Sequence, residues 1–121
     1  MKGASKFKAI LAVAILAGVT MPAGADPRYP WSGEWALSAE NCAEPNDGKI
    51  RYTANQVEGW EHSCGIIRLQ ALSTPSSWLL ELDCVGEGEQ WRAREILMLD
   101  NEAALHIFQD KRMAQYIRCA K

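Results

Sequence analysis

The chain has 121 residues, with 13 Lys plus Arg, 15 Asp plus Glu and a formal charge of −2. This length allows one small domain at most. The basic residues are scattered among acidic ones, as in residues 92–95, and this disfavours nucleic-acid binding because polyanions are bound by clustered Lys and Arg.

Residues 1–25 are predicted to be a secretory signal peptide. Three Lys lie within residues 2–8, an apolar run covers residues 9–19, and small residues at its end fit an A-x-A cleavage pattern. The run is shorter than the roughly 20 residues of a membrane-spanning helix, so no membrane anchor is expected after cleavage. Removing three Lys from the 13 basic residues leaves ten against 15 acidic residues, a charge of −5 for the mature chain 26–121.

The mature chain is expected to begin with an extended arm over residues 26–32, because Pro27 and Pro30 do not fit a helix interior or a central strand. Residues 33–121 then alternate apolar and polar side chains with period two, and Gly, Pro, Asn and Asp interrupt the runs. This pattern predicts an all-β domain of about seven to eight short antiparallel strands. Such a meander must curl into a small barrel to bury one face.

Four cysteines in an exported chain this small predict two structural disulfides. If Ile67, Leu69 and Ala71 align with Leu82, Leu80 and Trp78, then Cys84 lies on the apolar face and Cys64 on the other. A bridge between those two would need a bulge or a shifted register. Cys119 alternates with Ile117 and Met113, so it is expected to share the inward face with Cys84. The predicted pairs are therefore Cys42–Cys64 and Cys84–Cys119.

Catalytic and metal-binding motifs are missing from the sequence. It has no G-x-S-x-G, H-E-x-x-H, P-loop or G-x-G-x-x-G pattern. Residues 61–64 (Glu-His-Ser-Cys) offer three ligand types, but a Cys in a disulfide supplies no thiolate. Glu87 and Glu89 fall in an expected solvated turn. We therefore expect no catalytic residues, no metal and no cofactor, and an enzyme is the least favoured class.

Five Trp in this chain exceed what a small core needs. Trp35, Trp78 and Trp91 fit inward positions, whereas Trp31 lies in the arm and Trp60 lies between strands. For these last two, an exposed anchor for a partner and a plug over the barrel end both remain open. The candidate partner-binding residues are Pro27, Arg28, Tyr29, Pro30, Trp31 and Trp60.

The segment 32–37 (Ser-Gly-Glu-Trp-Ala-Leu) resembles the G-x-W start of lipocalin-like barrels. With the preceding arm and two Cys 22 positions apart, Cys42 and Cys64, it is similar to periplasmic metalloprotease inhibitors of the Inh type. That resemblance implies an arm that enters a protease cleft and a disulfide between these two Cys. Size and disulfide count are also similar to those of periplasmic inhibitors of C-type lysozyme.

These observations predict an exported, periplasmic or secreted binding module, foremost an inhibitor of a hydrolase that occludes its cleft. The alternatives are a small-ligand carrier that uses the barrel interior, or an envelope protein with a structural or stress role. We expect Trp and Leu to fill the interior of so small a barrel, and this argues against the carrier.

Overall fold

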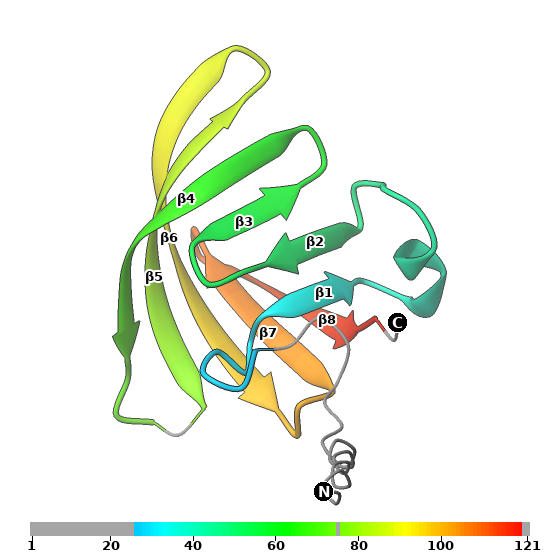
Figure 1. The fold of residues 1–121 in the computed structure, drawn as a ribbon, viewed down its shortest axis with the longest axis vertical. Coiled ribbons are helices and arrows are strands. Elements are labelled where there is room, and N and C mark those ends of the chain that lie inside the picture. Colours follow the sequence, from blue (N-terminus) through cyan, green and yellow to red (C-terminus); the bar gives the residue numbers. More distant parts are fainter. Residues whose placement is uncertain (1–25, 75, 120–121) are drawn as a thin grey trace, which may run out of the picture.

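The computed structural model describes residues 26–74 and 76–119, which form a closed antiparallel barrel (Figure 1). The predicted signal peptide lies outside the described residues. None of the described helical segments has the length and apolar character needed to cross a membrane. The elements are β1 (Gly33–Ala36), the 3-10 turn η2 (Ala39–Cys42), β2 (Lys49–Tyr52), β3 (Gln56–Gly59), β4 (His62–Ala71), β5 (Ser77–Gly86), β6 (Glu89–Asp100), β7 (Ala104–Gln109) and β8 (Arg112–Arg118).

The strand order confirms the predicted meander barrel. Each strand pairs with the next along the chain, and β1 pairs with β8 through Trp35 opposite Arg118 to close the ring. Two hairpins have two-residue turns in the left-handed region, at residues 87–88 and 110–111. Turns of this hand match the right-handed twist of the paired strands, so the turn residues fix the register of both hairpins.

The N-terminal segment is not the expected extended arm, because it folds back on itself beside β1. Asp26 and Tyr29 form an isolated bridge, and the backbone N–H of Ser32 donates to the carbonyl of Tyr29 at 2.8 Å. Trp31 is fully buried in the core, where its carbonyl accepts a 2.9 Å hydrogen bond from Nε1 of Trp35. The segment therefore lies beside β1 at the lower edge of the barrel in Figure 1, and its Trp31 side chain is part of the core.

Arg118 on β8 holds this segment against the barrel. Its guanidinium donates to the carbonyls of Pro30 at 2.8 Å, Ser32 at 3.0 Å and Glu102 at 2.9 Å. It also lies over the Trp35 ring, 4.2 Å from the centroid. One side chain thus joins the N-terminal segment, the β6–β7 turn and the last strand.

The disulfides join Cys64 to Cys84 and Cys42 to Cys119, so the predicted pairing is wrong. The predicted register holds near the β4–β5 turn, where Leu69 lies opposite Leu80. A bulge between Ile66 and Arg68 then inserts one extra residue, and Ile67 is 51% exposed. The shift turns Cys64 inward and places it directly opposite Cys84.

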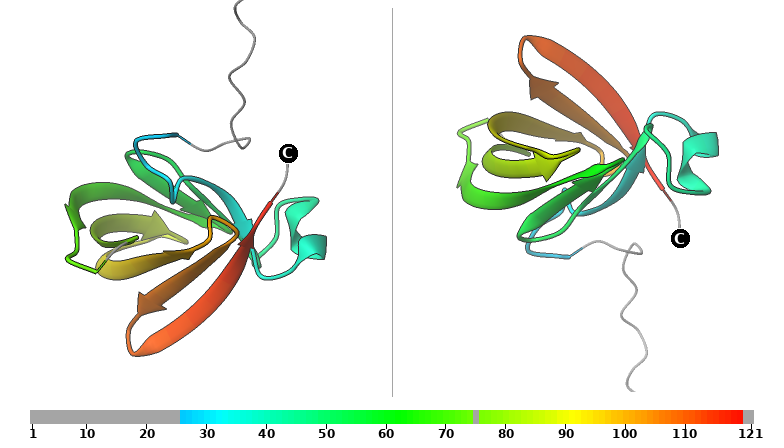
Figure 2. Two further views of the ribbon diagram at one scale, coloured as in Figure 1. Left: turned by 90° about the horizontal axis from the view of Figure 1, so that it is seen from below. Right: turned by 90° about the horizontal axis from the view of Figure 1, so that it is seen from above.

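The phase expected for β8 was also wrong, and Cys119 forms its disulfide with Cys42 and not with Cys84. The inward-facing Leu105 and Ile107 of β7 lie opposite Tyr116 and Ala114, so Ile117 has the outward phase. Cys119 therefore meets the β1–β2 loop, which projects outside the barrel in both views of Figure 2.

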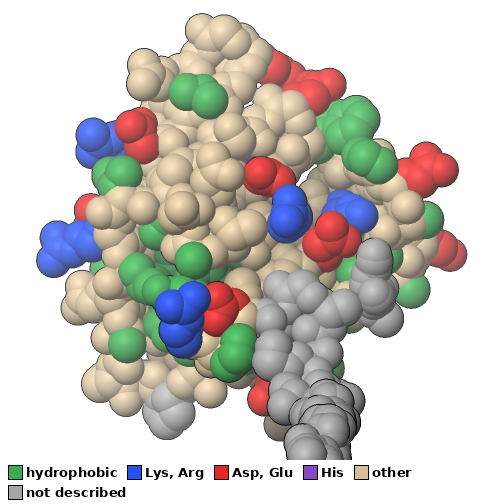
Figure 3. Space-filling model, viewed as in Figure 1, with side chains coloured by type: hydrophobic (Ala, Val, Ile, Leu, Met, Phe, Trp, Pro, Cys, Tyr) green, Lys and Arg blue, Asp and Glu red, His purple; other side chains and the backbone are tan. Residues whose placement is uncertain are grey.

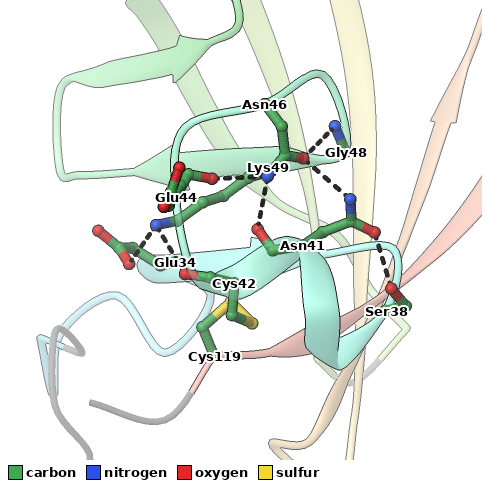
Figure 4. Close-up of a disulfide and its surroundings, with 9 residues drawn as sticks. All are labelled: Glu34, Ser38, Asn41, Cys42, Glu44, Asn46, Gly48, Lys49 and Cys119. Carbon is green, nitrogen blue, oxygen red and sulfur yellow. Dashed lines mark hydrogen bonds and ion pairs between the residues drawn. A yellow bond between two sulfur atoms is a disulfide. The ribbon is translucent and has the colours of Figure 1, made fainter.

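Hydrogen bonds order the loop around this second disulfide (Figure 4). The Asn46 side chain accepts from the backbone N–H of Gly48 and from the Asn41 amide, and its own amide donates to the carbonyl of Asn41. Lys49 Nζ donates to the carbonyl of Cys42 and forms a 3.3 Å ion pair with Glu34. The bridge thus links the C-terminal strand to an ordered loop.

Candidate functional site: the barrel cavity

The upper half of the barrel contains a cavity of about 560 Å³ that is open to solvent at one end. It begins above the buried Leu80, Leu97 and Leu105, which fill the lower half together with Trp31 and Trp35. Its walls come from β2 to β8, and it lies toward the end that bears the β3–β4, β5–β6 and β7–β8 turns. The lining residues are Ile50, Val57, His62, Cys64, Cys84, Trp91, Glu95, Ile107, Gln109, Asp110, Arg112, Met113, Ala114 and Tyr116.

One acidic side chain, Glu95 on β6, is buried in the wall of this cavity. Only 7% of the residue is exposed, and it lies opposite the fully buried Leu80 in the strand register. The Tyr52 hydroxyl donates to Oε1 at 2.6 Å, and Nε2 of Gln109 donates to Oε2 at 3.2 Å. Side chains from β2, β6 and β7 therefore position one carboxyl group inside the barrel.

Burial controls the protonation of this group and its neighbours. Burial raises the pKa of Glu95, while the hydrogen bond from Tyr52 and the charge of His62 act in the opposite direction. Burial, then the charge of Glu95 and the hydrogen bond to it, raise the pKa of Tyr52 well above its usual value. Burial and Glu95 likewise raise the pKa of Tyr116. Both phenols therefore remain protonated near neutral pH and available as donors.

Two aromatic rings, those of Trp91 and His62, lie at the open end of the cavity. Trp91 lies opposite Cys84 with the predicted inward phase, yet it is 40% exposed because it stands at the rim. Its ring centroid is 6.3 Å from that of His62. Gly86 lets the β5–β6 hairpin approach the β3–β4 hairpin closely, since a Cβ on it would lie 2.7 Å from the carbonyl oxygen of Glu61.

Outside this rim, Trp60 is 46% exposed in the β3–β4 turn. A shallow depression beside it is lined also by Glu61, Glu87, Glu89 and Trp91. A hydrogen bond with Glu87 raises the pKa of Glu61, with burial and the neighbouring charge as smaller causes. The predicted solvated turn at residues 87–89 is thus part of an acidic and aromatic tip.

The predicted partner-binding residues do not form one surface. Trp31 is in the core and is the plug rather than an anchor. Pro27 and Arg28 are exposed at the opposite end from Trp60. The Arg28 guanidinium forms a 3.1 Å ion pair with Asp26 and lies over the Tyr29 ring, 5.5 Å from its centroid. Tyr29 and Pro30 are half-buried.

The outer face of β1 to β3 carries charges in pairs. Arg51 forms a 3.2 Å ion pair with Glu58, beside the pair of Lys49 with Glu34. Figure 3 shows basic and acidic side chains next to one another on this face, with isolated hydrophobic ones between them. This face is an ordinary solvated surface without a patch of one sign.

Glu95 is a functional candidate that the sequence motifs did not reveal. It lies between Ala93 and Leu97 on the inward phase of its strand, so the alternation itself marks it as a buried acid. Tyr52 carries no comparable signal, because its contact with Glu95 joins β2 to β6 across the barrel, whereas Gln109 lies on β7, the strand that pairs with β6 in the next hairpin.

Comparison with known proteins gives no relative: no family model, no curated protein and no solved structure matches the chain. The class is therefore defined by the structure alone. It is a closed eight-stranded antiparallel barrel with two disulfides, which indicate an oxidising, extracytoplasmic environment. Within residues 26–74 and 76–119, no group of three His, Cys, Asp or Glu side chains converges as a metal site would require.

Proposed function

We propose that this protein is a periplasmic or secreted carrier that binds a small ligand inside the barrel. The observation that carries the proposal is the cavity of about 560 Å³. Ligand pockets typically measure about 300 to 1,000 Å³ and combine apolar walls with a few placed polar groups. Here Ile50, Ile107 and Tyr116 supply apolar wall, and Glu95 is the buried polar group.

The filled half of the barrel leaves room for this function in the other half. The sequence predicts that Trp and Leu fill the whole interior, and this prediction holds for the half that contains Trp31, Trp35 and Leu97 but is wrong for the half that holds the cavity. The N-terminal segment closes that end, so a ligand would enter past Trp91 and Arg112 at the other. One closed end and one open end are what a carrier requires.

A cavity-filling variant tests the proposal. Ala114 lines the cavity and is half-buried, whereas its neighbour Gln115 is exposed and has the outward phase. Fluorescence titration with N-phenyl-1-naphthylamine, a neutral apolar probe, should show saturable binding at one site. Ala114→Trp should weaken this binding at least tenfold, and Gln115→Trp should leave it unchanged.

The opposite results would contradict the carrier function. If the probe does not bind, or if Ala114→Trp and Gln115→Trp bind it equally, then the cavity is not the site. Circular dichroism spectra of both variants would establish that each retains the barrel.

Inhibition of a hydrolase is the second candidate, and the exposed Trp60 favours it. Exposed aromatic side chains are common binding anchors, and the neighbouring Glu61, Glu87 and Glu89 would complement a basic partner. Titration against a metalloprotease and a C-type lysozyme should then show stoichiometric loss of hydrolysis. Trp60→Ala should weaken inhibition at least tenfold, and the equally exposed Leu37→Ala should not. Full activity of both enzymes with excess protein would reject this candidate for these two classes.

A further inference from the structure

The carboxyl group of Glu95 is the feature of the cavity that remains to be explained. It is buried, and no Lys or Arg of the described residues forms an ion pair with it. A carboxylate without a cation is costly in a dry interior. A residue of this kind inside a binding cavity indicates that its charge serves the ligand.

The immediate partners of Glu95 are neutral donors. Tyr52 and Gln109 each supply one hydrogen bond, one to each carboxylate oxygen. A carboxylate has about four acceptor positions, so each oxygen retains capacity for a further donor. The other ionisable groups that act on this site are Tyr116 and His62, while Arg112 and Asp110 lie at the mouth.

Aromatic rings complete the environment. Tyr116 and Trp91 line the same cavity as Glu95. The face of an aromatic ring attracts cations, so a carboxylate that shares the cavity with Tyr116 is suited to an alkylammonium group, while Trp91 at the rim would contact the aliphatic body. Apolar neighbours such as Ile107 and Val57 would contact an aliphatic body.

We propose that the barrel selects ligands that carry a primary ammonium group on an apolar body, with the ammonium bound at Glu95. This inference rests on the proposed carrier function. It specifies in addition that the ligand is positively charged and that Glu95 binds the charged group. The Tyr52 and Gln109 donors hold the carboxylate in place, and the apolar body of the ligand extends toward Trp91.

Three ligands with the same eight-carbon chain test the selectivity by calorimetric titration at neutral pH: octylamine, 1-octanol and sodium octanoate. The wild-type protein should bind octylamine at least tenfold more tightly than either of the others. Glu95→Gln should reduce octylamine affinity at least tenfold and leave 1-octanol within twofold. Glu44→Gln removes the same charge from an exposed loop position outside the cavity and should change none of the three.

The outcomes separate this inference from the carrier function. If 1-octanol binds as tightly as octylamine, or if Glu95→Gln leaves the octylamine preference intact, the ammonium inference is wrong and the carrier remains. If none of the ligands and no neutral probe binds, both fail. The affinity order of the three ligands for the wild-type protein supports or overturns the inference even if Glu95→Gln does not fold.

Discussion

Replacement of Trp31 by alanine tests whether the N-terminal segment closes the barrel. The side chain is fully buried and packs edge-to-face against Tyr52, with ring centroids 6.0 Å apart, and against Tyr29 at 5.6 Å. Core Trp to Ala changes cost about 3 to 5 kcal/mol, and the two aromatic contacts favour the upper part of that range. This is a large fraction of the roughly 5 to 15 kcal/mol that stabilises a typical domain.

A conservative variant separates ring packing from hydrogen bonding. Nε1 of Trp31 is buried without a hydrogen-bond partner among the described residues. Trp31→Phe removes this unsatisfied donor while keeping an aromatic ring, so we expect a loss below about 1.5 kcal/mol. Trp60→Ala is the control, because a half-exposed side chain in a turn should change stability by about 0.5 kcal/mol or less.

Urea unfolding of the oxidised protein, followed by far-ultraviolet circular dichroism, provides the free energies. With a slope of about 1 to 2 kcal/mol per molar urea, Trp31→Ala should lower the midpoint by about 2 M or more. Equal midpoints for Trp31→Ala and Trp60→Ala would refute the role of the segment as the barrel closure.

Three further predictions concern the Cys42–Cys119 disulfide, the Arg118 side chain and the buried Glu95. Replacing Cys42 and Cys119 by Ser opens a loop of 77 residues and should cost about 4 to 5 kcal/mol in urea unfolding, whereas an unchanged midpoint would exclude a structural role. Arg118→Lys cannot keep all three hydrogen bonds to backbone carbonyls, so the free energy of unfolding should fall by about 1.5 to 3 kcal/mol in the same assay. An unchanged free energy would show that these hydrogen bonds do not stabilise the fold. The raised pKa of Glu95 means that the fold favours the protonated acid, so wild-type stability relative to Glu95→Gln should fall as the pH rises from about 4. A stability difference that stays constant from acidic to neutral pH would contradict the burial of this carboxyl.

The strand pattern was predictable because alternation is a local property. The inward phases of β5, β6 and β7 follow directly from Leu80, Leu97 and Leu105. β3 gave a weak signal, since Val57 is its one fully buried apolar residue. Strands with a single apolar side chain form because their neighbours pair with them.

The disulfide pairing was not predictable in the same way. A single inserted residue at Ile67 reverses the inward and outward positions of the β4 residues between it and Cys64, and no local feature of the sequence marks the bulge. In β8 the inward phase includes the polar Tyr116 and Arg118, so hydrophobicity indicated the wrong face. The arm likewise appeared extended because the buried contacts of Trp31 are made with residues of the barrel.

Indole N–H resonances test ligand binding inside the barrel most directly, because Trp91 lines the cavity, Trp31 and Trp35 lie in the filled half and Trp60 is exposed outside. In ¹H–¹⁵N spectra assigned by single Trp to Phe variants, saturating octylamine should move the Trp91 signal most, since Trp91 lines the cavity. The Trp31 signal should stay in place, because that side chain lies in the filled half. Movement confined to Trp60, or no movement of Trp91 at saturation, would contradict a ligand site within the barrel.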